Sequence, residues 1–137
     1  MKDLKINHLA AVVAIVLHQL IPMGWYTIFQ EKWMALTEIT QAEAESGGAS
    51  PYIISLICAA ITVYGMAYLF TKLPIDSALK GVQTAALFWL AFVFAQIMIQ
   101  NTFSMRSMEL TFIDQGNTFL TFIVTGALLG GWRKSSS

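Results

Sequence analysis

Charged side chains are scarce in this sequence. Asp, Glu, Lys and Arg make up only 12% of the 137 residues, whereas an ordinary soluble domain carries about 25%. A soluble protein of this size has a high surface-to-volume ratio and must cover that surface with polar groups. Eight basic residues balance eight acidic ones, so there is no basic face for nucleic acid. The composition therefore argues against both an ordinary soluble domain and a nucleic-acid-binding protein.

Cysteine and the common catalytic motifs are also nearly absent. Cys58 is the single cysteine and lies in an apolar run, so we interpret it as a buried, inert thiol. The sequence has no nucleophile elbow, no HExxH motif, no glycine-rich phosphate loop and no paired catalytic carboxylates. His8 and His18 are too far apart to share a metal ion. We therefore expect no enzymatic activity, no cofactor and no metal site.

Long hydrophobic runs are what the sequence does contain. Hydrophobic residues make up 56% of the chain. A helix needs about 20 mostly apolar residues to cross about 30 Å of hydrocarbon. Four segments meet this requirement, at about 4–29, 51–71, 78–101 and 110–132, and none has the alternating pattern of a barrel strand. The sequence predicts an all-α integral membrane protein, a four-helix transmembrane bundle that forms a single domain over residues 1–137.

The distribution of lysine and arginine predicts the orientation of this bundle. Six of the eight basic residues fall on one side of a four-span chain, and only Lys32 and Arg106 fall on the other. Basic residues concentrate on the cytoplasmic side of membrane proteins. Both termini are therefore expected to be cytoplasmic, in a bacterial cytoplasmic membrane. The six residues are Lys2, Lys5, Lys72, Lys80, Arg133 and Lys134.

The sizeable loop of the predicted bundle, at about 30–50, is acidic and lies on the outer side. Thr40 and Glu43 have the spacing of a capping box, in which each residue satisfies a backbone N–H group at a helix start. Gly47 and Gly48 follow and are expected to end the helix. The loop therefore predicts a short acidic helix at or above the outer surface of the membrane.

Polar side chains within the spans are expected to converge on one layer in the outer half of the bundle. Asp114, Thr118, Thr121 and Thr125 lie on a single stripe of the last span. Gln96 and Gln100 are expected to share a face of the third span that meets this layer. The candidate ligand-binding residues are Asp114, His18, Gln96, Gln100, Asn117, Thr118, Trp25 and Tyr26.

Proline adds a second reason to expect a polar layer. Pro22 displaces the hydrogen bond to the carbonyl group of His18, which then needs another donor in a medium without water. A glutamine from the third span is expected to supply it. Asp114 is the strongest functional candidate, because a carboxylate in hydrocarbon must be paired, protonated or hydrated.

Two interpretations of the layer stay open. In one, the polar groups only join helices, through hydrogen bonds that contribute about 0.6 kcal/mol each on average. In the other, they line a cavity that opens to the outer face and binds a small ligand or lipid, or relays protons. A structural or accessory subunit of a larger membrane complex is the alternative function. Gly126 and Gly130 form a small-xxx-small pair, which favours packing within the bundle over a homodimer interface.

Several short motifs resemble one family. Gly-Trp-Tyr occupies 24–26, Trp-Met at 33–34 precedes Leu-Thr-Glu at 36–38, and Ile-Asp-Gln-Gly at 113–116 opens the last span. These motifs resemble the small bacterial membrane family called domain of unknown function 1761. One motif departs from the family pattern, because Trp-Tyr follows Gly24 directly, whereas the family has a Gly-x-x-Trp-Tyr-like element. The resemblance implies four hydrophobic spans and no particular activity. It draws attention to Trp25, Tyr26, Trp33 and Asp114 without giving them a role.

Overall fold

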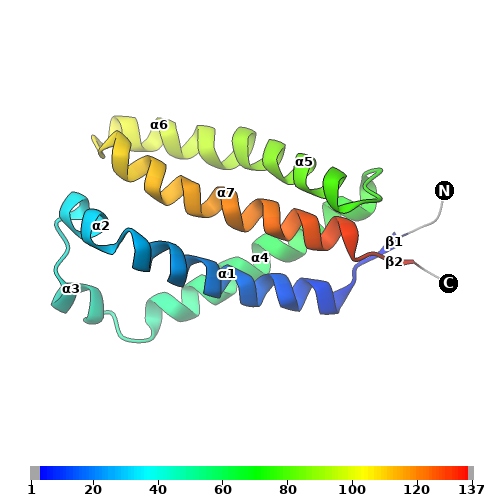
Figure 1. The fold of residues 1–137 in the computed structure, drawn as a ribbon, viewed down its shortest axis with the longest axis horizontal. Coiled ribbons are helices and arrows are strands. Elements are labelled where there is room, and N and C mark those ends of the chain that lie inside the picture. Colours follow the sequence, from blue (N-terminus) through cyan, green and yellow to red (C-terminus); the bar gives the residue numbers. More distant parts are fainter. Residues whose placement is uncertain (1–3, 136–137) are drawn as a thin grey trace.

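The computed structural model describes residues 4–135, and these are almost entirely helical (Figure 1). Apart from the helices, strand β1 (Leu4–Lys5) pairs antiparallel with β2 (Lys134–Ser135) and brings the two ends of the described chain together. The helices are α1 (His8–Ile28), α2 (Gln30–Thr37), α3 (Gln41–Glu45), α4 (Ser50–Lys72), α5 (Ala78–Phe88), the π-helix η1 (Trp89–Phe94), α6 (Ala95–Phe103) and α7 (Met108–Gly131).

The long helices run side by side along the long axis of the molecule (Figure 1). The β1–β2 pair and the turn between α4 and α5 lie at one end, whereas α2, α3 and the turn between α6 and α7 lie at the other. Helix α7 holds nine buried residues, against five in α4 and three in α1, so it forms the centre of the bundle. The hydrophobic segments predicted from the sequence thus correspond to four helical rods.

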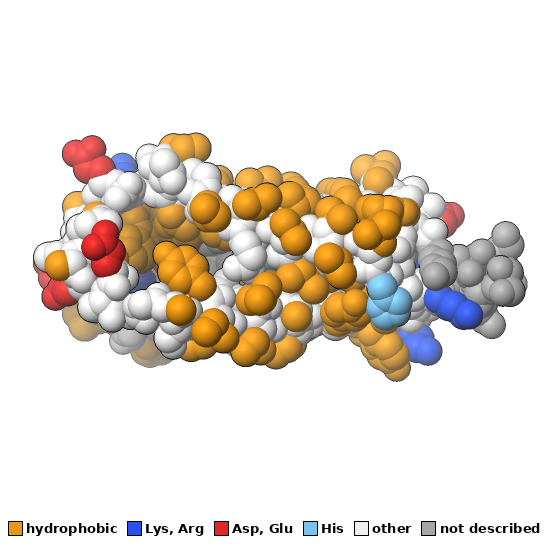
Figure 2. Space-filling model, turned by 90° about the horizontal axis from the view of Figure 1, so that it is seen from below, with side chains coloured by type: hydrophobic (Ala, Val, Ile, Leu, Met, Phe, Trp, Pro, Cys, Tyr) orange, Lys and Arg blue, Asp and Glu red, His pale blue; other side chains and the backbone are white. Residues whose placement is uncertain are grey.

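Three of these rods are long and apolar enough to cross a membrane: His8–Ile28, Ser50–Lys72 and Ala78–Phe103. Hydrophobic side chains cover the middle of the molecule, while acidic side chains gather at the α2/α3 end (Figure 2). This distribution indicates a membrane protein. The expected fourth span, α7, does not meet the same criterion. It carries Asp114, Gln115 and Asn117 among its apolar residues, and its neighbours rather than lipid surround much of it.

Local signals in the sequence explain where several helices begin. The side chains of Asn7, Ser77 and Ser107 accept hydrogen bonds from backbone N–H groups at the starts of α1, α5 and α7. In α3 both halves of the predicted Thr40–Glu43 capping box are present, so that prediction is confirmed. Helix α2 was not foreseen as a separate element of the acidic loop.

Glycine allows α5 and α7 to approach until their backbones touch. A Cβ atom built on Gly130 would lie 2.5 Å from the carbonyl oxygen of Ser77, and one on Gly81 would collide with the backbone of Gly126. Contacts this close are open only to residues without a side chain. The small-xxx-small pair of α7 therefore packs within the bundle, as the sequence favoured.

Helices α1 and α4 pack tightly over the half of the molecule that holds the termini and separate toward the other end. Ala11 and Ala14 of α1 meet Val63 of α4, and all three are fully buried. Toward the α2/α3 end, by contrast, residues 51–58 of α4 are all exposed. The two helices therefore form a V that opens toward α2 and α3, with its apex at these three small or branched side chains.

Candidate functional site

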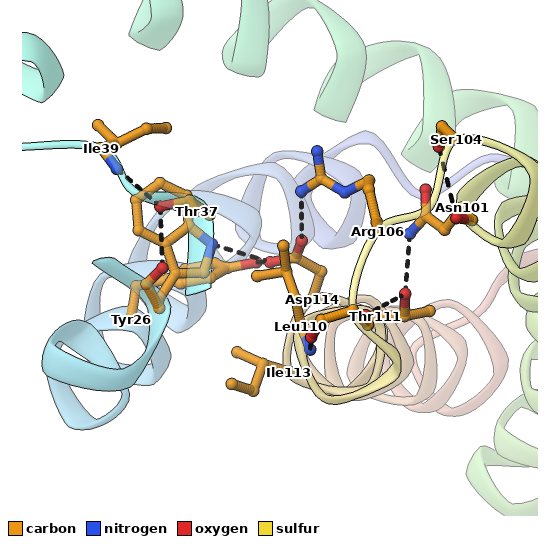
Figure 3. A network of polar contacts seen from close by, with 12 residues as sticks. Tyr26, Thr37, Ile39, Asn101, Ser104, Arg106, Leu110, Thr111, Ile113 and Asp114 are labelled. Atoms are coloured by element: carbon orange, nitrogen blue, oxygen red, sulfur yellow. Dashed lines mark hydrogen bonds and ion pairs between the residues drawn. The ribbon is translucent and has the colours of Figure 1, made fainter. Parts of the chain in front are cut away.

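The Asp114 carboxylate joins four parts of the chain (Figure 3). Tyr26 of α1 donates a hydrogen bond of 2.6 Å to its Oδ1 atom, and the indole N–H of Trp33 in α2 donates to the same oxygen over 3.2 Å. The guanidinium group of Arg106, in the turn before α7, lies 3.7 Å from Oδ2. The carboxylate is therefore paired and hydrogen-bonded, and it connects α1, α2 and the α6–α7 turn to α7.

Trp25 makes a second connection between α1 and α7. Its indole N–H donates a hydrogen bond of 2.8 Å to the carbonyl oxygen of Ile113. The same indole ring fills the space above Gly116, where a Cβ atom would lie 2.6 Å from the ring. Any larger residue at Gly116 would therefore displace the ring and its hydrogen bond.

Both basic residues at the α2/α3 end are paired with acidic partners. Lys32 of α2 forms an ion pair with Glu109 of α7, and Arg106 is paired with Asp114. These pairs tie α2 and the α6–α7 turn to the start of α7. They also compensate the positive charge at this end of the molecule.

A hollow of about 610 Å³ occupies the V between α1 and α4, beneath α2 and α3. Its walls combine apolar and aromatic side chains with a few hydroxyl, amide and imidazole groups. The lining residues are His18, Gln19, Pro22, Met23, Tyr26, Thr27, Gln30, Trp33, Met34, Gln41, Ala44, Pro51, Tyr52 and Ser55.

A second hollow of about 220 Å³ adjoins the first one and reaches α7. His18, Pro22 and Ser55 line both hollows, so the two meet at these residues. Cys58 also lines the second hollow and is exposed, so the interpretation of its thiol as buried is wrong. The remaining lining residues are Ala59, Thr62, Asn117, Thr118, Thr121 and Phe122.

Hydrogen bonding around the second hollow is incomplete. Nε2 of His18 lies 2.9 Å from the hydroxyl oxygen of Thr125, and Ser55 donates to the side-chain oxygen of Gln19 over 3.3 Å. The side-chain nitrogen of Gln19 and the side-chain oxygen of Asn117 are buried and have no hydrogen-bond partner among residues 4–135. One free donor and one free acceptor therefore belong to residues that line the joined hollows.

The structure brings together only part of the expected polar layer. Gln96 and Gln100 are exposed on α6, away from the hollows, so the prediction that they meet the layer and that one supports the His18 carbonyl is wrong. The π-helical turn η1 contributes, because it rotates the residues after it relative to a continuous α-helix, and no residue of α5, η1 or α6 lines either hollow. Thr118, in contrast, accepts a hydrogen bond of 2.8 Å from the indole of Trp89.

No side chains in the described part of the chain are arranged to hold a metal ion. Groups of three or more His, Cys, Asp or Glu residues with suitable spacing are absent from residues 4–135. The geometry is instead that of an interhelical polar cluster next to an uncharged, largely apolar hollow.

A family model described as "Protein of unknown function (DUF1761)" matches residues 9–130. The chain belongs to this family. The match covers the Asp114 cluster and both hollows. No curated protein and no solved structure matches the chain.

In this member of the DUF1761 family, the motifs that carry the resemblance meet at one place. Trp25 and Tyr26 at the end of α1 and Trp33 in α2 all hydrogen-bond to α7, two of them to Asp114 and one next to it. Sequence reasoning had noted these residues but could not pair them, because they lie more than 80 positions away from Asp114. Arg106 had been used only to predict the orientation, and Gln19 was not among the candidate ligand-binding residues.

Proposed function

We propose that this protein is a four-span protein of the bacterial cytoplasmic membrane that binds a small ligand or lipid and is not an enzyme. At about 1.5 Å per residue, the 24 residues of α7 extend about 36 Å, enough to cross hydrocarbon beside the three apolar rods. Its polar residues are compatible with this position, because they face the neighbouring helices. Four spans place both termini on one side.

The charges favour the cytoplasm as that side. Lys5, Lys72, Lys80 and Arg133 belong to segments at the end that holds the termini. The two basic residues at the opposite end are paired with carboxylates. An excess of Lys and Arg marks the cytoplasmic side of a membrane protein, so the α2/α3 end faces outward in this proposal.

The observation that carries ligand binding is the hollow of about 610 Å³ in the V between α1 and α4. Pockets for small molecules have volumes of about 300–1,000 Å³ and are mostly apolar with a few convergent polar groups. This hollow has both properties. The hollow is open to the outside of the bundle, so a molecule can enter it without unfolding a helix.

The polar residues divide between two roles in this proposal. Asp114, Tyr26, Trp25 and Thr118 use their hydrogen bonds to join helices. His18, Gln19, Asn117 and Ser55 face the joined hollows or lie at their walls. We therefore assign ligand binding to the second group and a structural role to the first.

The closed apex of the V favours a binding site over a path across the membrane. Ala11, Ala14 and Val63 fill the space between α1 and α4 on the side of the termini, and none of them is exposed. Tyr64 packs against these residues, and its hydroxyl group lies 3.0 Å from Nδ1 of His8. A molecule that enters from the α2/α3 end would therefore stop within the joined hollows.

Native mass spectrometry after gentle extraction tests the proposal. The wild-type protein is expected to keep a bound small molecule, and Ser55→Trp is expected to lose it, because the indole would fill the point where the hollows meet. Leu56→Trp is the matched control, since Leu56 is 50% exposed on the outside of α4. The same pattern of bound species in all three proteins would contradict a specific site in the V.

A further inference from the structure

We infer that the joined hollows take a neutral amphiphile, a molecule with an uncharged hydrogen-bonding head group and an apolar chain. This inference deepens the proposed function and rests on it. Long-chain alcohols and isoprenoid alcohols share this chemistry. The occupant would enter from the lipid leaflet at the α2/α3 end.

The absence of charge from the walls is the first argument. None of the described residues that line either hollow is Asp, Glu, Lys or Arg. A phosphate or carboxylate removed from water needs a cationic partner, and an ammonium group needs an anionic one. An uncharged head group avoids this cost. Among the described lining residues only His18 could become a cationic partner for an anion, and its Nε2 atom already contacts the Thr125 hydroxyl group.

Several charged groups at the α2/α3 end already have partners. Asp114 is held by Tyr26, Trp33 and Arg106, and Lys32 is paired with Glu109. In the roof, the carboxylate of Glu43 accepts hydrogen bonds from Thr40, and that of Glu45 accepts one from Gln41. To pair with a ligand charge, any of these groups would have to give up an existing contact.

The polar side chains on the walls of the two hollows include both hydrogen-bond donors and acceptors. The side-chain nitrogen of Gln19 is a donor without a partner within residues 4–135, and the side-chain oxygen of Asn117 is an acceptor without one. The Ser55 hydroxyl lies on the wall of both hollows. A ligand hydroxyl group at the junction can exchange hydrogen bonds with Ser55, because it accepts one hydrogen bond and donates another.

The remainder of the larger hollow suits an apolar chain. Pro22, Met23, Met34, Pro51 and Tyr52 line it, and methionine side chains adapt to irregular apolar shapes. The first turns of α4, residues 51–58, are exposed, so one wall of the V borders the region where lipid lies. Figure 2 shows hydrophobic side chains reaching the hollowed end of the molecule. A chain can therefore enter sideways without crossing a charged barrier.

Photoaffinity labelling in vesicles tests the head-group preference. Three probes carry the same chain and the same diazirine position: a long-chain alcohol, the corresponding carboxylate at pH 8, and a phosphatidylcholine. Peptide mass spectrometry then locates the label. The alcohol is expected to label α1 and the first half of α4 in a saturable way. The other two probes are expected to label only exposed residues, in proportion to their concentration.

Three variants define the site. Ser55→Trp is expected to abolish saturable labelling by the alcohol, while Leu56→Trp leaves it unchanged. Asn117→Leu removes the free acceptor with little change in size. It is expected to raise the alcohol concentration at half-saturation by about fivefold to tenfold, the effect of one hydrogen bond. It also keeps the test decisive if the bulkier Ser55→Trp protein misfolds.

The outcomes separate the inference from the proposed function. Saturable labelling of the same peptides by the carboxylate or the phosphatidylcholine, with loss in Ser55→Trp, would overturn the neutral head group but leave ligand binding in place. No saturable labelling by any of the three probes would overturn both.

Discussion

Tyr26 and Asp114 are 88 positions apart in the sequence, yet the tyrosine hydroxyl donates a hydrogen bond of 2.6 Å to the carboxylate. This contact joins the end of α1 to the first half of α7. Trp33 donates a further hydrogen bond to the carboxylate, and Arg106 forms an ion pair with it. Because three partners within the protein already hold the Asp114 carboxylate, we regard this residue as a structural centre, although the sequence had made it the strongest functional candidate.

A double-mutant cycle with Tyr26→Phe and Asp114→Asn is expected to show a coupling free energy of about 1–2 kcal/mol. Hydrogen bonds to charged groups contribute about 1.5–3 kcal/mol in proteins, and those between membrane helices contribute less. Equilibrium unfolding in mixed micelles measures the coupling, and Tyr68→Phe on the exposed face of α4 is the control. Additive effects of the two substitutions would contradict the contact. Alcohol labelling of the hollows is expected to persist in Asp114→Asn.

Gly126→Ala is expected to destabilise the protein by about 1–3 kcal/mol, the usual cost of overpacking. The added methyl group would meet the backbone of Gly81 and Cβ of Ala85, which lies 2.6 Å away. Gly65→Ala in α4 is the matched control, since nothing lies within 4 Å of its added Cβ atom. Alanine favours the helix over glycine, so the control protein is expected to be as stable as wild type or more so. Thermal unfolding in detergent compares the two.

Features that depend on neighbouring residues could be predicted from the sequence. Hydrophobic run length located the helical rods, and the Thr40–Glu43 spacing located the start of α3. The four-residue spacing of Gly126 and Gly130 indicated close packing of α7. In each case the physical signal lies within a few turns of one helix, so no knowledge of the tertiary fold is needed.

Features that depend on the register between helices could not be predicted. The faces of Gln96 and Gln100 were assigned on a continuous α-helix, and the π-helical turn η1 rotates them outward. No residue between Trp89 and Phe94 predicts a π-helical turn from the sequence. The separation of α1 and α4, which creates the hollow, likewise depends on where Ala11 and Ala14 meet Val63. The polar residues of the site were therefore partly identified, but the space between them was not.

Cysteine accessibility tests the proposed topology. In a Cys58→Ser background, Ser46→Cys and Ser104→Cys are expected to react with a membrane-impermeant maleimide added to intact cells, because both residues lie in exposed segments at the α2/α3 end. Asp76→Cys and a cysteine appended to the carboxyl terminus are expected to react only after permeabilisation. Reaction of the carboxyl-terminal cysteine in intact cells, together with Ser104→Cys, would show that α7 does not cross the membrane.

Glu43 provides a test of the α3 cap in solution. The backbone N–H and the hydroxyl group of Thr40 donate hydrogen bonds to its carboxylate, over 2.8 and 3.1 Å, and hold the pKa of Glu43 below its ordinary value. A carboxyl group with a lowered pKa in the folded state stabilises that state above its unfolded pKa. This contribution is lost as the pH falls through the folded pKa. The cap is therefore expected to weaken only under acidic conditions.

Thr40→Ala is expected to raise the pKa of Glu43 part of the way to its ordinary value, because the backbone N–H, the larger cause of the shift, remains. Titration of the side-chain carboxyl carbon by NMR in nanodiscs measures the change. Thr37→Ala is the control, since Thr37 bonds within α2 and does not contact Glu43. If Glu43 titrates at the same pH in wild type and in Thr40→Ala, the threonine hydroxyl group does not contribute to the lowered pKa of Glu43. Only the hydrogen bond from the backbone N–H group of Thr40 would then hold the carboxylate.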